Sequence, residues 1–188
     1  MKKLLAILML GVLPFMASAQ LTTINPDTVC IGTAGSIYEV PATAGYTYNW
    51  TITPPGVQTS GGTTNSIGVD WSAAAGGLIV GGVTVTATDV NGCTSLPVTL
   101  DIFILAIIPT ITAIGPFCED EPCVALNGTP LGGTFTGTGV VGGTFCPATA
   151  GPGTHVLTYT YTLNGCTFTA TINVVVNPLP VLTPIQHN

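Results

Sequence analysis

Basic side chains are almost absent from the sequence. Lys2 and Lys3 are the only Lys or Arg residues of the 188-residue chain, which carries eight Asp and Glu residues and a formal net charge of −6. Because phosphate neutralisation needs clustered Lys and Arg, we expect no nucleic acid among the partners. The same lack argues against phosphoryl transfer, anionic cofactors and electrostatic docking on acidic membranes, and we predict no cofactor.

A helical hydrophobic period is also missing. Apolar residues make up 46% of the chain, and in the mature part they alternate with polar ones, which is the pattern of strands buried on one face. Threonine fills many of the outward positions, where its β propensity is retained. Frequent Gly and Pro divide these runs into short strands, so the sequence predicts an all-β fold of the sandwich type. The alternating runs cover residues 46–52, 96–104, 157–163 and 166–176.

The N-terminus has the pattern of a secretory signal peptide. Lys2 and Lys3 precede an apolar segment over residues 4–16, and Ala17-Ser18-Ala19 is a small-residue cleavage site. The apolar segment is too short for a spanning helix, which needs about 20 residues. We therefore expect a cleaved signal peptide over residues 1–19 and no membrane insertion of the mature chain. The expected location is the cell surface or the extracellular medium, with the periplasm as the alternative.

A short motif occurs twice and indicates two domains. Val90-Asn91-Gly92-Cys93-Thr94 is repeated as Leu163-Asn164-Gly165-Cys166-Thr167. Each Asn-Gly pair lies between two alternating runs, which favours a β-hairpin with a type I′ turn. A long apolar strand and a proline-marked connector follow each motif. The repeat therefore predicts two tandem Ig-like β-sandwich domains after the signal peptide, over residues 20–108 and 109–178, with a linker-like tail at 179–188.

The six cysteines of an exported chain are expected to form disulfides. The repeat layout pairs Cys30 with Cys93 and Cys118 with Cys166, and Cys123 with Cys146 remains. Only the symmetry of the repeat selects these pairs, because six cysteines alone allow many connectivities. We predict no metal site, since the sequence has no CxxC pair and no cysteine at ligand spacing from a histidine.

No residue pattern predicts an active site. His155 shares the strand parity of Leu157 and is interpreted as a half-buried strand residue, because no nucleophile constellation accompanies it. His187 belongs to the tail and is expected to be solvated. Residues 119–121 form the only acidic cluster, where a solvated connector is favoured over a Ca²⁺ site. We therefore assign no catalytic residue and no metal ligand, and we predict that the protein is not an enzyme.

Two features leave room for a binding function. Tyr46, Tyr48 and Trp50 form a stripe that alternates as a core face does, so a carbohydrate platform is the less favoured interpretation. Trp71 borders a loop rich in Ala and Gly and is the best candidate for an exposed ligand contact. Residues 102–108 are nearly all apolar. They predict a core strand, but as an unpaired edge the run would accept a strand from another chain.

Several motifs resemble the repeats of Bacteroidota surface proteins. Residues 132–140, Phe145-Cys146-Pro147 and residues 150–155 resemble the Ig-like repeat of adhesin-like and gliding-associated proteins. Residues 38–41, 46–50 and 69–71 are similar to the companion PKD-like repeat. The family usually has other residues at the positions of Cys123 and Cys146, and the presence of both cysteines supports their pairing.

The resemblance implies a non-enzymatic structural or adhesive repeat segment of an exported cell-surface protein. The expected partners are an unidentified surface glycan or protein, or further repeats of the same polypeptide. The alternatives are a carbohydrate-binding module or a strand-exchanging filament subunit.

Overall fold

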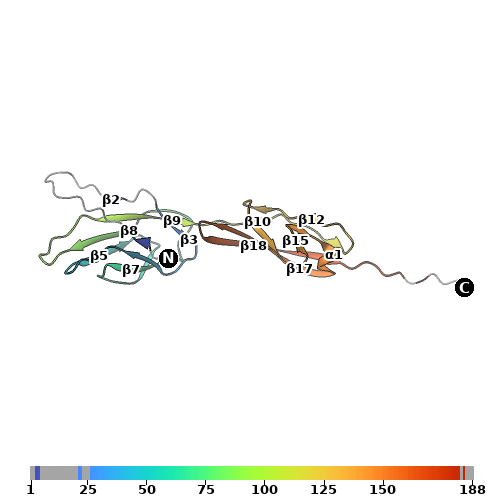
Figure 1. Ribbon diagram of the computed structural model, residues 1–188, viewed down its shortest axis with the longest axis horizontal. Coiled ribbons are helices and arrows are strands. Elements are labelled where there is room, and N and C mark those ends of the chain that lie inside the picture. Colours follow the sequence, from blue (N-terminus) through green and yellow to red (C-terminus); the bar gives the residue numbers. More distant parts are fainter. Residues whose placement is uncertain (1–2, 5–20, 23–25, 183, 185–188) are drawn as a thin grey trace. The chain divides into compact units, whose positions relative to one another are not determined.

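The computed structural model describes residues 3–4, 21–22, 26–182 and 184 (Figure 1). Residue contacts divide the chain into two units, Met1–Ala106 and Ile107–Asn188. Each unit consists of short and long β-strands around a hydrophobic core of its own, and the only described helix has four residues. The predicted all-β fold is confirmed. The predicted signal peptide lies outside the described residues, except for Lys3 and Leu4.

The first unit is a sandwich of two sheets. One sheet has the strand order β1-β4-β7-β6 and the other the order β2-β9-β8-β5, with β3 also paired to β9. The core combines side chains from both sheets, such as Ile67 and Val69 of one and Val85 and Ile102 of the other. The strands are β1 (Lys3–Leu4), β2 (Leu21–Thr22), β3 (Asp27–Cys30), β4 (Ser36–Glu39), β5 (Thr47–Ile52), β6 (Val57–Ser60), β7 (Ser66–Asp70), β8 (Gly77–Thr88) and β9 (Val98–Leu105).

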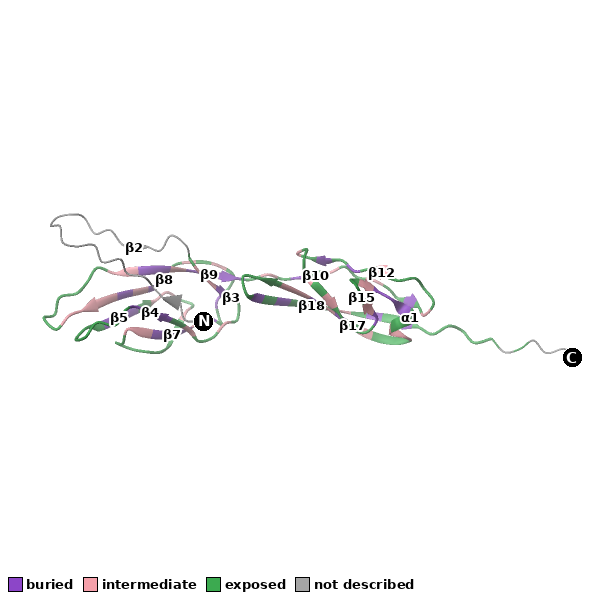
Figure 2. Cartoon of the chain, in the orientation of Figure 1, coloured by how far each residue is buried: buried purple, intermediate pink, exposed green. Residues whose placement is uncertain are grey.

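The alternation of the sequence explains which face of each strand is buried. In β5, Tyr48 and Trp50 are buried while Thr47, Asn49 and Thr51 are exposed, because successive side chains of a strand point to opposite faces. Figure 2 shows the resulting bands of buried and exposed residues along the strands. The core assignment of Tyr48 and Trp50 is confirmed, whereas Tyr46 lies before β5 and is 40% exposed.

Strand β9 lies in the interior of its sheet. It pairs with β8 in the antiparallel sense, where Gly77 is opposite Ile104, and with β3 in the parallel sense, where Cys30 is opposite Leu105. Ile102 and Ile104 are almost fully buried. The interpretation of residues 102–108 as a core strand is therefore confirmed over Ile102–Leu105. The alternative of an unpaired edge at these residues is wrong, because β9 is paired on both sides. The hypothesis of a strand-exchanging filament subunit depended on that unpaired edge.

The second unit contains one larger sheet, of order β11-β18-β17-β14, and two smaller ones, β12-β16-β15 and β10-β13. Its core joins Phe117, Leu157 and Val174 of the larger sheet to Phe145 of β16. The elements are β10 (Thr110–Ile111), β11 (Phe117–Cys118), β12 (Val124–Ala125), β13 (Gly128–Thr129), β14 (Thr134–Thr136), β15 (Val140–Val141), β16 (Thr144–Phe145), α1 (Pro147–Ala150), β17 (Gly153–Leu163) and β18 (Cys166–Asn177). Within the described part of the chain, no helix is long and apolar enough to cross a membrane.

The two Asn-Gly motifs form different turns. Between β17 and β18, Asn164 and Gly165 have φ angles of 50° and 80°, and a type I′ turn requires positive φ at both positions. Between β8 and β9 only Gly92 has a positive φ. There the Asp89 carboxylate accepts hydrogen bonds from the backbone N–H groups of Asn91 and Cys93, at 2.9 and 2.8 Å, and builds a wider loop. The type I′ prediction thus agrees with the second hairpin and is wrong for the first.

Candidate functional site

Trp71, the predicted ligand contact, is fully buried with 0% of its surface exposed. It follows β7 directly and lies on the same face as Ile67 and Val69, because alternate residues of a strand share a face. Its indole N–H donates a hydrogen bond of 3.0 Å to the hydroxyl oxygen of Tyr38. A side chain enclosed in this way cannot meet a ligand, so the prediction for Trp71 is wrong.

Tyr38 is the hydrogen-bond partner that Trp71 needs in the core. Burial raises the pKa of Tyr38 well above its ordinary value of 10.0, and the nearby charge of Asp27 raises that pKa further. The phenol therefore stays neutral over the whole physiological range of pH. The pair satisfies two buried polar groups, and it offers neither a proton donor nor a proton acceptor to a substrate.

The other buried Tyr and Trp side chains form hydrogen bonds with backbone groups of nearby loops. Each uses its hydroxyl or indole group to bind a backbone group of a connecting segment, which is the usual role of a buried Tyr or Trp. The bonds run from Tyr48 to Pro41 O at 3.1 Å and from Thr43 N to Tyr48 at 2.9 Å, from Trp50 to Thr64 O at 2.8 Å, from Tyr159 to Pro130 O, and from Gly133 N to Tyr159 at 2.8 Å. They hold loops in place and leave no aromatic platform among these residues.

The titratable side chains in the described part of the chain do not form a reactive constellation. His155 is half-buried, as predicted, and its Nε2 lies 2.8 Å from the carbonyl oxygen of Gly151. In the acidic cluster, a carboxylate oxygen of Glu121 accepts a hydrogen bond of 3.0 Å from the backbone N–H of Cys118 and closes a turn. Among the described residues, no group of three or more His, Cys, Asp or Glu side chains could hold a metal ion.

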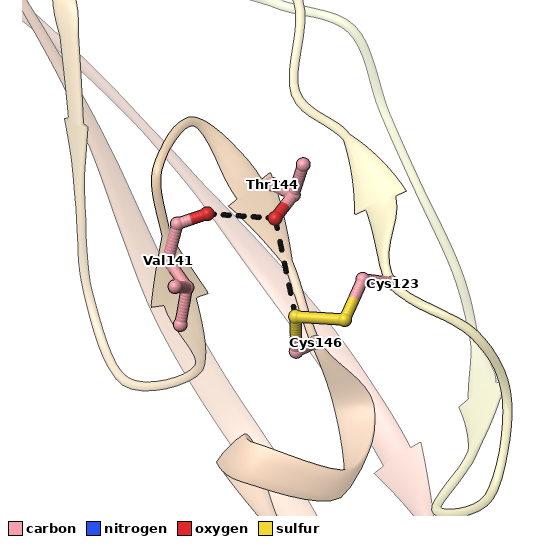
Figure 3. Close-up of a disulfide and its surroundings, with 4 residues drawn as sticks. All are labelled: Cys123, Val141, Thr144 and Cys146. Carbon is pink, nitrogen blue, oxygen red and sulfur yellow. Dashed lines mark hydrogen bonds between the residues drawn. A yellow bond between two sulfur atoms is a disulfide. The ribbon is translucent and has the colours of Figure 1, made fainter.

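One of the three predicted disulfides is present as predicted. Cys123 precedes β12 and Cys146 follows β16, and because Val124 is paired with Phe145 the two cysteines are opposite each other, 4.1 Å apart between Cα atoms. Figure 3 shows the bond beside Thr144, whose hydroxyl donates a hydrogen bond of 2.7 Å to the carbonyl oxygen of Val141. The bond joins the start of β12 to the end of β16, its neighbour in the sheet.

The predicted pair Cys30–Cys93 is wrong, because Cys93 is an exposed free thiol. Cys30 lies beside Leu105 at the end of β9, whereas Cys93 precedes the start of the same eight-residue strand. At about 3.3 Å per residue these positions are roughly 23 Å or more apart, and a disulfide needs Cα atoms within about 7 Å.

The predicted pair Cys118–Cys166 is wrong for the same reason. Cys118 is an exposed free thiol that lies beside Asn177, at the end of β18, and Cys166 is the first residue of that 12-residue strand. The two positions are roughly 36 Å apart at about 3.3 Å per residue. Cys30 and Cys166 are themselves disulfide-bonded. The repeat correctly equates Cys30 with Cys118 and Cys93 with Cys166. It does not show that the two cysteines within each unit lie at opposite ends of that unit's last strand.

An open groove on the second unit was not anticipated from the sequence. It has a volume of about 510 Å³ and is lined by Ile114, Gly115, Pro116, Asn173, Val175 and Asn177. The two carboxamides can donate and accept hydrogen bonds, but the lining holds no titratable side chain and no aromatic ring. The groove therefore lacks the groups for acid–base chemistry and for stacking on a sugar.

Two units with separate cores, each built of β-strands, define an all-β protein of the sandwich class. Comparison with known families agrees with this class for the first unit. Residues 17–102 match the family of the PKD-like domain. No curated protein matches the chain.

Several solved structures are similar at low identity. The fibronectin(III)-like modules of Clostridium thermocellum CbhA are 15% identical, with 87% of this chain and 95% of that chain covered and a TM-score of 0.36. The titin domains Z1Z2 in complex with telethonin are 14% identical, with 86% and 95% covered and a TM-score of 0.32. Immunoglobulin domains 1–4 of Sidekick-1 are 17% identical, with 85% and 48% covered and a TM-score of 0.33.

Proposed function

We propose that the protein is a non-enzymatic structural repeat segment of an exported cell-surface protein. The observation that carries the proposal is that the polar groups of the buried Tyr and Trp side chains bind the chain's own loops and core. A ligand-binding or catalytic module would expose some of these groups in a cleft. Here they stabilise two small sandwiches, which is the use expected of a spacer.

Export is supported by the chemistry of the chain. The Cys123–Cys146 bond fits an oxidising compartment, because disulfides persist outside the cytoplasm. The N-terminal pattern of two lysines, an apolar segment and a small-residue cleavage site is typical of a secretory signal. A cell-surface position follows from the resemblance of residues 132–155 to the repeats of Bacteroidota surface proteins.

The alternative of a carbohydrate-binding module is less well supported than the sequence suggested. Trp71 is buried, and the groove beside Asn173 and Asn177 has no aromatic ring for a sugar to stack on. Tyr46 is 40% exposed. A single half-exposed ring provides little of the surface that such modules use.

The proposal is tested by a binding screen and a location assay. The purified chain, applied to an array of polysaccharides and oligosaccharides, is expected to bind none of them above the level of a Tyr46→Ala and Asn173→Ala control. In intact producing cells, protease added outside is expected to remove the protein. Saturable glycan binding that the control loses would assign the chain to the carbohydrate-binding class. Protection from external protease until lysis would place the protein inside the cell envelope.

A further inference from the structure

Two of the six cysteines have exposed free thiols, Cys93 in the first unit and Cys118 in the second. Free cysteines are usually buried, and an exposed thiol in an oxidising compartment is chemically reactive. The positions of these two cysteines within the repeat show what kind of partner they fit.

Each unit holds one cysteine of each of two positional kinds. The first kind is a parallel-strand cysteine, which ends a short strand paired in parallel with the end of the unit's last strand: Cys30 is opposite Leu105 of β9, and Cys118 is opposite Asn177 of β18. The second kind is a hairpin cysteine, just after an Asn-Gly pair and before or at the start of the last strand. Cys93 and Cys166 are of this kind.

The chain itself shows that both positions form disulfides. Cys30, a parallel-strand cysteine, and Cys166, a hairpin cysteine, are both disulfide-bonded. The two free thiols are again one of each kind, because Cys93 is a hairpin cysteine and Cys118 a parallel-strand cysteine. A disulfide between Cys93 and Cys118 would therefore use the same two kinds of position at which Cys30 and Cys166 are bonded, and this is an observation independent of the exposure of the two thiols.

We propose that Cys93 of one copy of the chain forms a disulfide with Cys118 of a second copy. The two surfaces joined are different, so every dimer retains one free Cys93 and one free Cys118, and the linkage continues into a linear covalent polymer. The inference deepens the proposed function by naming a second copy of the chain as the partner. It depends on that function only through the oxidising location.

The linkage needs a disulfide oxidant, such as oxidised glutathione. The Cys93 thiolate attacks one sulfur of the oxidant and forms a mixed disulfide. One thiolate of the oxidant leaves and takes up the proton that the Cys93 thiol has lost. The Cys118 thiolate of the second copy then attacks the Cys93 sulfur and releases the other oxidant thiolate. Two protein thiols are thereby oxidised by two electrons, and one disulfide of the oxidant is reduced to two thiols.

Charge at the two thiols gives the reaction a characteristic salt dependence. Asp89 lies beside Cys93, where its carboxylate accepts the backbone N–H of Cys93, and Glu121 does the same for Cys118 within the acidic cluster of residues 119–121. The two ends to be joined are therefore both negative, with no Lys or Arg after Lys3 to offset them. Because salt screens exposed charges, the linkage is expected to be faster at 1 M than at 0.01 M ionic strength, where the Debye lengths are about 3 and 30 Å.

The test uses the purified full chain and two single variants, Cys93→Ser and Cys118→Ser, each incubated with a mixture of oxidised and reduced glutathione. Non-reducing gels are expected to show a ladder of dimers, trimers and longer species for the unaltered chain. Each variant alone is expected to stay monomeric. An equal mixture of the two variants is expected to form dimers and nothing larger, because only one productive pair of thiols remains. The double variant Cys93→Ser/Cys118→Ser is the matched control and is expected to remain monomeric.

Peptide mapping identifies the new bond. Pepsin is the suitable protease, because trypsin finds no site after Lys3 and acidic digestion prevents disulfide exchange. A cross-linked peptide that joins the segments around Cys93 and Cys118 supports the proposal. Dimers of either variant alone would show linkage between like cysteines and overturn it, as would a Cys93–Cys118 bond within a monomer or the absence of any ladder. None of these outcomes bears on glycan binding or surface location, so the proposed function is judged separately.

Discussion

Removal of the Cys123–Cys146 bond is expected to destabilise the second unit and leave the first unchanged. The change is the double variant Cys123→Ala/Cys146→Ala. Thr144 keeps its 2.7 Å hydrogen bond to Val141 in this variant, since that bond does not involve the disulfide, and the hydroxyl lies 3.9 Å from the Cys146 sulfur. The effect measured is therefore that of the covalent link and not that of an orphaned polar group.

The size of the effect follows from the closed loop. The two cysteines are separated by 23 positions in the sequence, and a loop of that length restricts the unfolded chain by about 3.4 kcal/mol at 25 °C on the chain-entropy model. For a unit of this size, roughly 4–8 °C of melting temperature corresponds to each kcal/mol. The second unit is then expected to melt roughly 14–27 °C lower than in the unaltered chain.

The distribution of tryptophan makes the assay specific. Trp50 and Trp71 are the only tryptophans of the chain, and both lie in the core of the first unit. In urea titrations, tryptophan fluorescence therefore follows the first unit, while far-UV circular dichroism follows both. We expect an unchanged fluorescence midpoint and a new, earlier transition in the dichroism.

The matched control is Cys93→Ala/Cys118→Ala, which removes two exposed free thiols and is expected to change stability by less than about 0.5 kcal/mol. A loss below about 1 kcal/mol in the disulfide variant would refute the loop-entropy reasoning. An equal shift of the fluorescence midpoint would refute the assignment of the bond to a separately cored second unit.

Three further predictions concern the first unit. Gly56→Ala places a Cβ atom against Cζ3 of Trp71 and is expected to cost about 1–3 kcal/mol by overpacking. The loss is read from the fluorescence midpoint in urea, and an unchanged midpoint would contradict the tight contact. Tyr38→Phe leaves the buried indole N–H of Trp71 without an acceptor and is expected to cost about 1–3 kcal/mol in the same assay, with no loss if the 3.0 Å bond is absent in solution. The backbone N–H of Cys93 holds the pKa of Asp89 below its ordinary value of 3.8, so the stabilisation by this exposed carboxylate is present above that pH and lost as the pH falls through the lowered pKa. Carbon NMR of the carboxylate checks the direction, and a pKa at or above 3.8 would show that the loop around Asp89 differs.

Local alternation predicted the strands and most of the core, because the period of two directly determines which side chains share a face. The same rule could have placed Trp71, which has the parity of the buried Ile67 and Val69. The neighbouring Ala- and Gly-rich loop indicates exposure instead. For Trp71 the correct signal is therefore present in the sequence, in the strand parity, and the composition of the adjacent loop is the weaker guide.

The disulfides show a different limit. The cross-strand position of Cys123 and Cys146 depends on a contact between short neighbouring strands, which the sequence indicates only by elimination and by resemblance. The positions of Cys30 and Cys118 depend on the short strands β3 and β11, which run parallel to the distant last strands β9 and β18. Nothing in the local pattern specifies that register, so sequence symmetry could equate the two units but could not locate the ends of their strands. The exposed thiols and the groove beside Asn173 were missed for the same reason.

The parallel pairing of β3 with β9, and of β11 with β18, also determines how each unit responds to tension. The chain enters the first unit's pair at Asp27 of β3 and leaves it at Leu105 of β9, at the opposite end of the paired segment; β11 and β18 repeat this arrangement. A pull applied at the two ends of one unit therefore shears all the hydrogen bonds of the pair together, where an antiparallel pair pulled from one end would open them one at a time. If the second unit gives way under such a pull, the Cys123–Cys146 bond withholds the 23-position segment between its cysteines, which at about 3.4 Å per residue is roughly 80 Å of extension. Reduction of that bond would release this length as a measurable increase in the extension of a single second unit held at its two ends.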